Sequence, residues 1–132
     1  MSDVESIIED HHARNRELLK LIASKGADPN SPCDIDLHFW TFSEDAARSL
    51  CAALEARGYS SVRWNRAVAD PSLWNVETCI QASPVSVAAP AFVEDLARLA
   101  DTHDGEFEGW ARLSETPSNK SLDASGGSAS RN

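Results

Sequence analysis

Residues 33–42, CDIDLHFWTF, decide the fold because apolar and polar side chains alternate along them. Successive side chains of a β-strand point to opposite faces of the sheet, so an alternation of period two predicts a strand. One face carries Ile35, Leu37 and Phe39, and the opposite face carries Asp34, Asp36, His38 and Trp40. The sequence therefore predicts a strand with one strongly apolar face, which packs against a core.

The sequence after this strand predicts helices and strands in turn. Ser43 can cap a helix that Gly58 ends. Further strands are predicted over Tyr59–Trp64, Trp74–Ala82 and Glu106–Leu113; Pro84 and Pro90 bracket a loop, and Pro90 begins a further helix. This order gives two right-handed crossovers joined by a hairpin. It predicts a ferredoxin-like α+β fold, βαββαβ, with two helices on one face of a four-stranded antiparallel sheet.

An additional helix is predicted before this unit, over about residues 3–25, where apolar residues recur at helical spacing. His11 and Asn15 lie on the same stripe and make its middle polar. This helix either covers the open face of the sheet or leaves it exposed. Residues 1–113 are expected to form one domain, and the Ser/Gly-rich residues 114–132 are expected to be disordered because they have almost no large apolar side chain to bury.

The charge balance restricts the kinds of partner. Twelve Lys and Arg against 21 Asp and Glu give a net charge of −9. Because nucleic acids and anionic membranes attract basic surfaces, direct binding to either is disfavoured, and a basic protein is the better electrostatic match. An acidic N-terminus without an apolar block and an odd number of cysteines favour a cytoplasmic protein with reduced thiols.

Motifs for catalysis or for a cofactor are not found. His11 and His12 would point about 100° apart on a helix and cannot both reach one metal ion. His38 and Cys79 fall on the polar faces of their strands, so with Glu77 they offer one alternative, a small hydrolase or ligand-binding domain. The favoured interpretation is a non-catalytic domain that works by contact, with no metal and no cofactor.

The candidate contact surface combines carboxylates with two tryptophans. Six acidic residues crowd the last helix and strand, with Arg98 as the only opposing charge: Glu94, Asp95, Asp101, Asp104, Glu106 and Glu108. Trp40 and Trp110 alternate with the residues of their strands that are expected to face the core, and so are expected to point to the other side of the sheet. Both indoles are therefore expected on the open face of the sheet, with His38 as a neighbour, where large aromatic side chains suit binding.

Three stretches resemble one protein family. They are GADP at Gly26–Pro29, EARGY at Glu55–Tyr59 and, most specifically, ADTHDGEFEGW at Ala100–Trp110. Together they resemble the RraB family of protein regulators of ribonuclease E over about residues 4–113. Phe107 and Glu108 stand where the family pattern has Tyr and Asp, and the tail here is neutral where some members end in an acidic one.

The resemblance implies a ferredoxin-like fold and a cytoplasmic bacterial inhibitor that binds ribonuclease E and catalyses nothing itself. The binding residues expected for this chain are the six acids together with Trp110, Trp40 and His38. The alternative partner is another basic or RNA-processing protein bound by a domain of the same fold.

Overall fold

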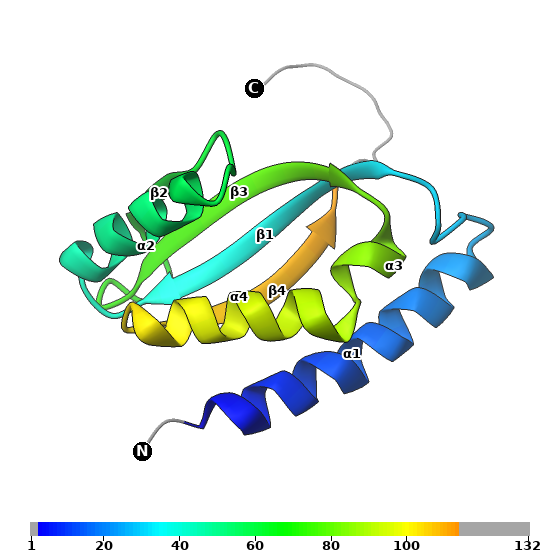
Figure 1. Cartoon of the computed structure of the whole chain (residues 1–132), viewed down its shortest axis with the longest axis horizontal. Helices are drawn as coiled ribbons and strands as arrows, with labels where there is room; N and C mark the ends of the chain where they lie inside the picture. The colour runs from blue at the N-terminus through cyan, green and yellow to red at the C-terminus, as the bar shows by residue number, and fades with distance from the viewer. Residues whose placement is uncertain (1–2, 114–132) are drawn as a thin grey trace.

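A single antiparallel sheet with the strand order β2-β3-β1-β4 organises the described part of the chain, residues 3–113 (Figure 1). The computed structural model has the elements α1 (Val4–Ser24), β1 (Cys33–Thr41), α2 (Glu44–Ala56), β2 (Arg63–Arg66), β3 (Trp74–Ala82), α3 (Pro84–Val87), α4 (Pro90–Thr102) and β4 (Gly105–Arg112). The fold is therefore α+β, as predicted. The expectation of a disordered tail concerns residues 114–132, which lie outside the described residues.

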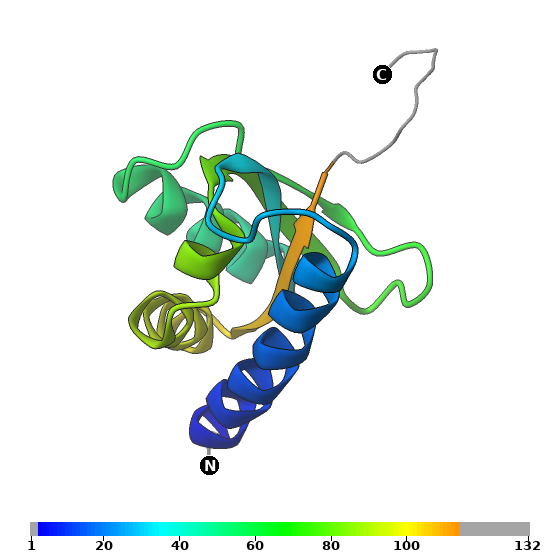
Figure 2. The same ribbon diagram turned by 90° about the vertical axis from the view of Figure 1, so that its right-hand side faces the viewer.

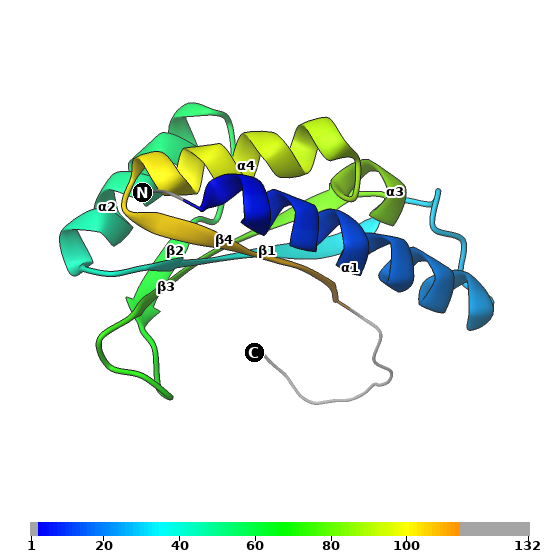
Figure 3. The same cartoon turned by 90° about the horizontal axis from the view of Figure 1, so that it is seen from below.

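The core forms between the sheet and the helices α2, α3 and α4, which lie on one face of it (Figure 3). The apolar face of β1 is fully buried, since Ile35, Leu37 and Phe39 are each 0% exposed. The predicted cap of α2 is present, because Ser43 Oγ accepts a hydrogen bond from the Ala46 N–H at 3.1 Å. The alternation that predicted β1 thus also identified the residues of the core.

Two boundaries differ from the prediction. The second strand begins at Arg63 rather than at Tyr59. The Tyr59 N–H still bonds to the last turn of α2, and Ser61 has a φ of +56°, so the chain cannot extend before Val62. The predicted loop between Pro84 and Pro90 contains the short helix α3, which Ser83 caps through its hydroxyl.

Helix α1 lies beside α4 and along the edge strand β4, as Figures 1 and 2 both show. Its amino-terminal end is tied to α4 by an ion pair of 2.8 Å between Glu5 and Arg98. Because α1 extends the helix layer beyond β4, no helix within residues 3–113 covers the opposite face of the sheet, which we call the open face (Figure 3). Within residues 3–113, no helix combines the length and the apolar character needed to cross a membrane.

A β-bulge in β4 changes the face on which Trp110 lies. Phe107 pairs with Phe39 and Gly109 with His38, so Glu108 has no partner on β1. Residues directly opposite each other share a face, and Trp110 lies opposite the buried Leu37. The predicted position of Trp110 on the open face is therefore wrong, because the extra residue in the bulge reverses the alternation.

Candidate protein-binding surface

The open face of the sheet carries polar and charged side chains and one tryptophan. The register assigns to it Asp34, Asp36, His38 and Trp40 from β1, Asn75, Glu77, Cys79 and Gln81 from β3, Arg63 and Asn65 from β2, and Glu106 from β4. This surface thus carries four carboxylates and one guanidinium, that of Arg63. The open face is acidic, as the whole chain is.

The middle of the open face is held by a paired network around His38. Its Nδ1 lies 3.5 Å from Glu77 Oε2, and its Nε2 lies 3.9 Å from Asp36 Oδ2. Arg63 Nη2 bonds to Glu77 Oε1 at 3.1 Å. Arg63 Nη2 also lies 3.9 Å from Asp36 Oδ1 and so offsets part of the charge of both carboxylates. The centre of the face therefore attracts a basic partner less than the unpaired acids at its edge do.

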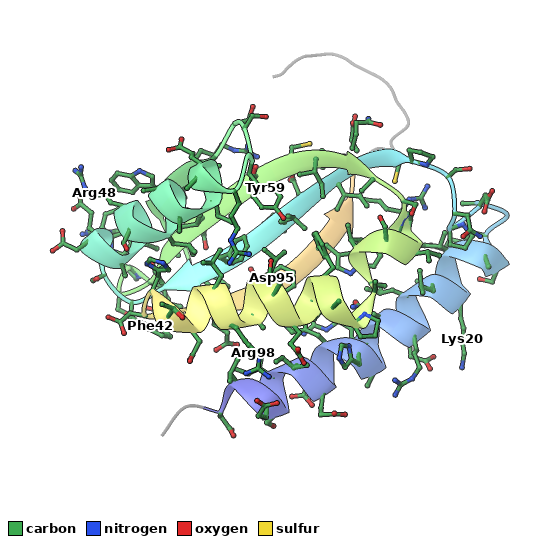
Figure 4. The ribbon with its side chains drawn as sticks, in the orientation of Figure 1. Lys20, Phe42, Arg48, Tyr59, Asp95 and Arg98 are labelled. Carbon is green, nitrogen blue, oxygen red and sulfur yellow. The ribbon has the colours of Figure 1, made fainter. Side chains whose placement is uncertain are left out.

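Unpaired acids lie beside one exposed and one half-buried aromatic side chain where β1 ends and β4 begins. We call this group, Trp40, Phe42, Asp104 and Glu106, the aromatic–acidic corner. Glu106 pairs with the half-buried Trp40 across the ladder, and the Phe42 N–H donates to the Asp104 carbonyl at 3.4 Å. Phe42 is 59% exposed and is labelled in Figure 4 at the end of the molecule where α4 stops. Among the described residues, neither Asp104 nor Glu106 forms an ion pair, so both carboxylates are available to a partner.

Gly105 allows the two strands to approach at this corner. A Cβ built on it would lie 2.5 Å from the Trp40 carbonyl oxygen, closer than real Cβ atoms come to backbone. Any other residue there would push β4 away from β1. The glycine that follows α4 thus holds Glu106 opposite Trp40.

Two of the six predicted acids are already paired within the helix layer. Glu94 lies 3.7 Å from the Arg98 guanidinium, which also holds Glu5, and Asp95 is paired with Arg57 of α2. Figure 4 labels Asp95 and Arg98 on different sides of α4. Glu94 and Asp95 therefore do not continue the aromatic–acidic corner.

The other two predicted acids also lie in separate places. Asp101 is exposed in the last turn of α4, close in sequence to the corner. Glu108 lies at the bulge, where its backbone carbonyl accepts a hydrogen bond of 3.0 Å from Arg14 of α1. The structure thus divides the predicted patch between the helix layer, the corner and the bulge.

Trp110 belongs to the contact between β4 and α1. Its indole N–H donates to Asn15 Oδ1 at 2.9 Å. One turn earlier on α1, the His11 Nε2–H donates to the Phe107 carbonyl at 2.7 Å, and burial lowers the pKa of His11 below its ordinary 6.5 despite that bond. Gly109, with a φ of +140°, lets the Arg14 side chain approach the bulge. Gly109 and Trp110, which we call the GW motif, therefore dock α1 on the edge strand.

Sequence reasoning missed His11 and Asn15 as partners of β4. Both are only 3% exposed. The signal was their position on the apolar stripe of α1, since a polar residue at a buried helix position needs a hydrogen-bond partner.

The thiol of Cys79 does not support nucleophilic chemistry. Burial and the nearby carboxylate of Asp36 raise the pKa of Cys79 above its ordinary value. A protonated thiol is a poor nucleophile at neutral pH. Among residues 3–113, no group of three or more His, Cys, Asp or Glu side chains is placed to hold a metal ion.

Comparison with known families identifies the chain. The family model for the regulator of ribonuclease activity B, RraB, matches residues 12–111. The chain belongs to the RraB family. This confirms the resemblance seen in the sequence, and the family's role is the regulation of ribonuclease activity. The match runs from α1 through β4 and includes the aromatic–acidic corner; a search of curated proteins finds no match.

Proposed function

We propose that this RraB-family protein binds ribonuclease E in the cytoplasm and modulates its RNA-cleaving activity without catalysing a reaction itself. The contact is made by the aromatic–acidic corner and the adjoining open face of the sheet. The observation that carries the proposal is the pair of unpaired carboxylates, Asp104 and Glu106, beside an exposed Phe42 and a half-buried Trp40.

The chemistry of the corner fits a basic protein segment. Carboxylates without an internal partner attract Lys and Arg over a distance and speed the encounter. Aromatic side chains then contribute contact area at little entropic cost, and Arg stacks well on an indole. Asp101 extends this surface along α4, and His38 extends it along β1. Trp110 does not belong to the contact itself; it stabilises β4 by fixing α1 to this strand through its bond to Asn15.

The fold that presents this surface is proposed to be the ferredoxin-like one. The proposal is supported by the strand order β2-β3-β1-β4 with α2 and α4 on one face of the sheet. In that arrangement the two central strands, β1 and β3, are held by the core on one side and free on the other.

Binding of purified ribonuclease E to two charge-matched variants tests the proposal. D104N/E106Q removes two carboxylates from the corner, and E94Q/D95N removes two that are already paired on α4. We expect the corner variant to bind at least about tenfold more weakly and the control variant to stay within about threefold, because a rim charge with an internal partner contributes little. Raising the salt from about 50 mM to about 300 mM should weaken wild-type binding.

Three outcomes would count against the proposal. If wild-type protein does not bind ribonuclease E at low salt, the partner is another protein. If both variants lose the same affinity, net charge rather than the corner drives binding. If salt has no effect, the acids are not part of the contact.

A further inference from the structure

The two edges of the sheet differ in how they are covered. At the β4 edge, side chains of α1 donate hydrogen bonds to the strand backbone. His11 Nε2–H donates to the Phe107 carbonyl at 2.7 Å. Arg14 donates to the Glu108 carbonyl at 3.0 Å. Strand β2 forms the other edge, and α1 lies on the side of the sheet away from it (Figure 1). Within residues 3–113, β2 pairs with β3 alone, so its outer side is open to a further strand.

The ladder shows which backbone groups of β2 point outward. The Ala67 N–H donates to the Leu73 carbonyl at 2.9 Å, toward β3. The backbone groups of successive strand residues point to alternate sides, so those of Asn65 also point to β3, whereas those of Trp64 and Arg66 point away from it. Among the described residues, neither Trp64 nor Arg66 takes part in a backbone bond outside the sheet. An added strand therefore finds donors and acceptors in line.

Two arginines stacked on two tryptophans lie beside these backbone groups. We call Arg48, Trp64, Arg66 and Trp74 the aromatic–cationic edge. The ring centroids of Trp64 and Trp74 are 5.5 Å apart. The Arg48 guanidinium lies 5.1 Å from the Trp64 ring centroid, and the Arg66 guanidinium lies 4.9 Å from that of Trp74. Trp64 pairs with the buried Val76, so the cluster lies on the helix side of the sheet. Figure 4 labels Arg48 on α2, on the side of the molecule away from α1.

Stacking orders each guanidinium without using its N–H groups. A guanidinium stacks through its flat face, whereas its N–H donors lie in its plane and stay available to a carboxylate. Arg66 forms no ion pair within residues 3–113. Arg48 pairs with Glu44 of the same helix, and both are exposed, so this pair contributes little. Because both cations are already ordered, a carboxylate that binds them loses less affinity to side-chain entropy.

The charge of this edge selects its partner. A second copy of the chain would bring Arg63 and Arg66 of two β2 strands together, and like charges across a ladder are destabilising. Single-stranded RNA stacks its bases on free aromatic faces, whereas each indole here already contacts an arginine and the other indole. An extended segment with carboxylates satisfies both the backbone groups and the guanidiniums. We propose that the aromatic–cationic edge binds an extended acidic segment of a partner protein, which joins β2 as a fifth strand.

The register of β2 sets the pattern of that segment. Side chains opposite Trp64 and Arg66 lie on the helix side of the sheet, where the guanidiniums of Arg48 and Arg66 are. Carboxylates spaced two residues apart therefore meet both cations, and the intervening side chains point to the open face. Since β3 and β1 separate β2 from Glu106, this contact is distinct from the aromatic–acidic corner.

Titration of the isotope-labelled full chain with the peptide acetyl-SEVEVES-amide, followed by NMR of the backbone amides, tests this inference. Its glutamates alternate as the register requires. A second peptide with the same sequence is N-methylated at every Glu and Val, which keeps the charge and removes the N–H donors. A third, acetyl-SKVKVKS-amide, reverses the charge. Single-stranded oligouridylate tests whether the edge prefers RNA.

Three variants separate charge from backbone pairing. R66Q removes one cation of the edge. R66P also removes the outward N–H, and it breaks no bond to β3 because the backbone groups of Arg66 point away from that strand. R16Q is the matched control, since Arg16 is an exposed arginine of α1 without an ion pair among the described residues. Unchanged thermal midpoints verify that the variants fold; if R66P does not, the N-methylated peptide tests the same backbone bonds.

We expect the acidic peptide to bind with a dissociation constant of about 0.1–1 mM and to shift the amide resonances of Trp64 and Arg66 most. R66Q should weaken binding at least about threefold, R66P at least about tenfold, and R16Q less than about twofold. The N-methylated and lysine peptides should each bind at least about tenfold more weakly than the acidic peptide.

Absence of binding by the acidic peptide, equal affinity of the N-methylated peptide, or equal affinity of R66Q and wild type would overturn the inference. Tighter binding of oligouridylate than of the acidic peptide would also overturn it and assign the edge to RNA. Ribonuclease is not present in this experiment, and D104N/E106Q should bind the peptide as wild type does. Failure of the inference is therefore distinct from failure of the proposed function.

Discussion

Replacing Trp110 by Phe tests whether the GW motif docks α1 on β4. The substitution keeps an aromatic ring opposite Leu37 but removes the indole N–H that donates to Asn15 Oδ1 at 2.9 Å. Asn15 is 3% exposed and its Nδ2 is already without a partner, so the variant leaves both ends of a buried amide unsatisfied. Such a loss costs about 1–3 kcal/mol, and the smaller ring adds about 1 kcal/mol through lost apolar burial.

We therefore expect W110F to lower the free energy of unfolding by about 2–4 kcal/mol, a large share of the about 5–15 kcal/mol typical of a domain. Urea unfolding followed by far-UV circular dichroism measures it. N15L leaves the indole N–H of Trp110 without its partner and should also lower the free energy of unfolding. In W110F/N15L both partners are apolar, so the double variant should lose less than the sum of the single losses by about 1–2 kcal/mol.

Two results would refute this reasoning. W110F within about 0.5 kcal/mol of wild type would mean that the indole bond contributes nothing measurable. Strict additivity in the double variant would mean that Asn15 and Trp110 do not interact.

Three further predictions concern stability. G109A should lower the free energy of unfolding by about 1–3 kcal/mol because a φ of +140° strains any L side chain; an unchanged urea midpoint would contradict the bulge. S43A should cost about 1 kcal/mol through loss of the bond from Ser43 Oγ to the Ala46 N–H, measured as a lower thermal midpoint, whereas an unaffected midpoint would deny the cap a role. Burial lowers the pKa of His11, so its imidazole binds a proton more readily in the unfolded chain than in the folded one. The free energy of unfolding therefore has its full contribution from neutral His11 above pH 6.5, and this contribution is lost as the pH falls through the lowered pKa of the folded state. H11Q should therefore show a smaller loss of urea resistance than wild type between about pH 7.5 and about pH 5, and equal losses would refute the assignment.

The sequence predicted the elements whose signals are local. The alternation from Cys33 to Phe42 identified both β1 and its buried residues, and Ser43 identified the start of α2. The late start of β2 was missed because it depends on how the chain leaves α2, with Ser61 in a left-handed conformation. The strand propensity of a short segment does not reveal such a turn.

The candidate site was harder to predict because it depends on contacts between distant segments. A single unpaired residue, Glu108, moves Trp110 from the open face to the side of α1. Likewise, the pairing of Asp95 with Arg57 joins two helices and removes one acid from the expected patch. The sequence showed which residues carry charge, but only the fold shows which charges are already satisfied.

The central claim is that the aromatic–acidic corner is the surface through which the protein acts on ribonuclease E. Its most direct test is the rate at which purified ribonuclease E cleaves a labelled RNA while wild type, D104N/E106Q or E94Q/D95N is titrated in. We predict that wild type and E94Q/D95N alter the rate at similar concentrations, whereas D104N/E106Q needs at least about ten times more protein. Equal potency of all three proteins, or a cleavage rate that wild type leaves unchanged, would contradict the claim.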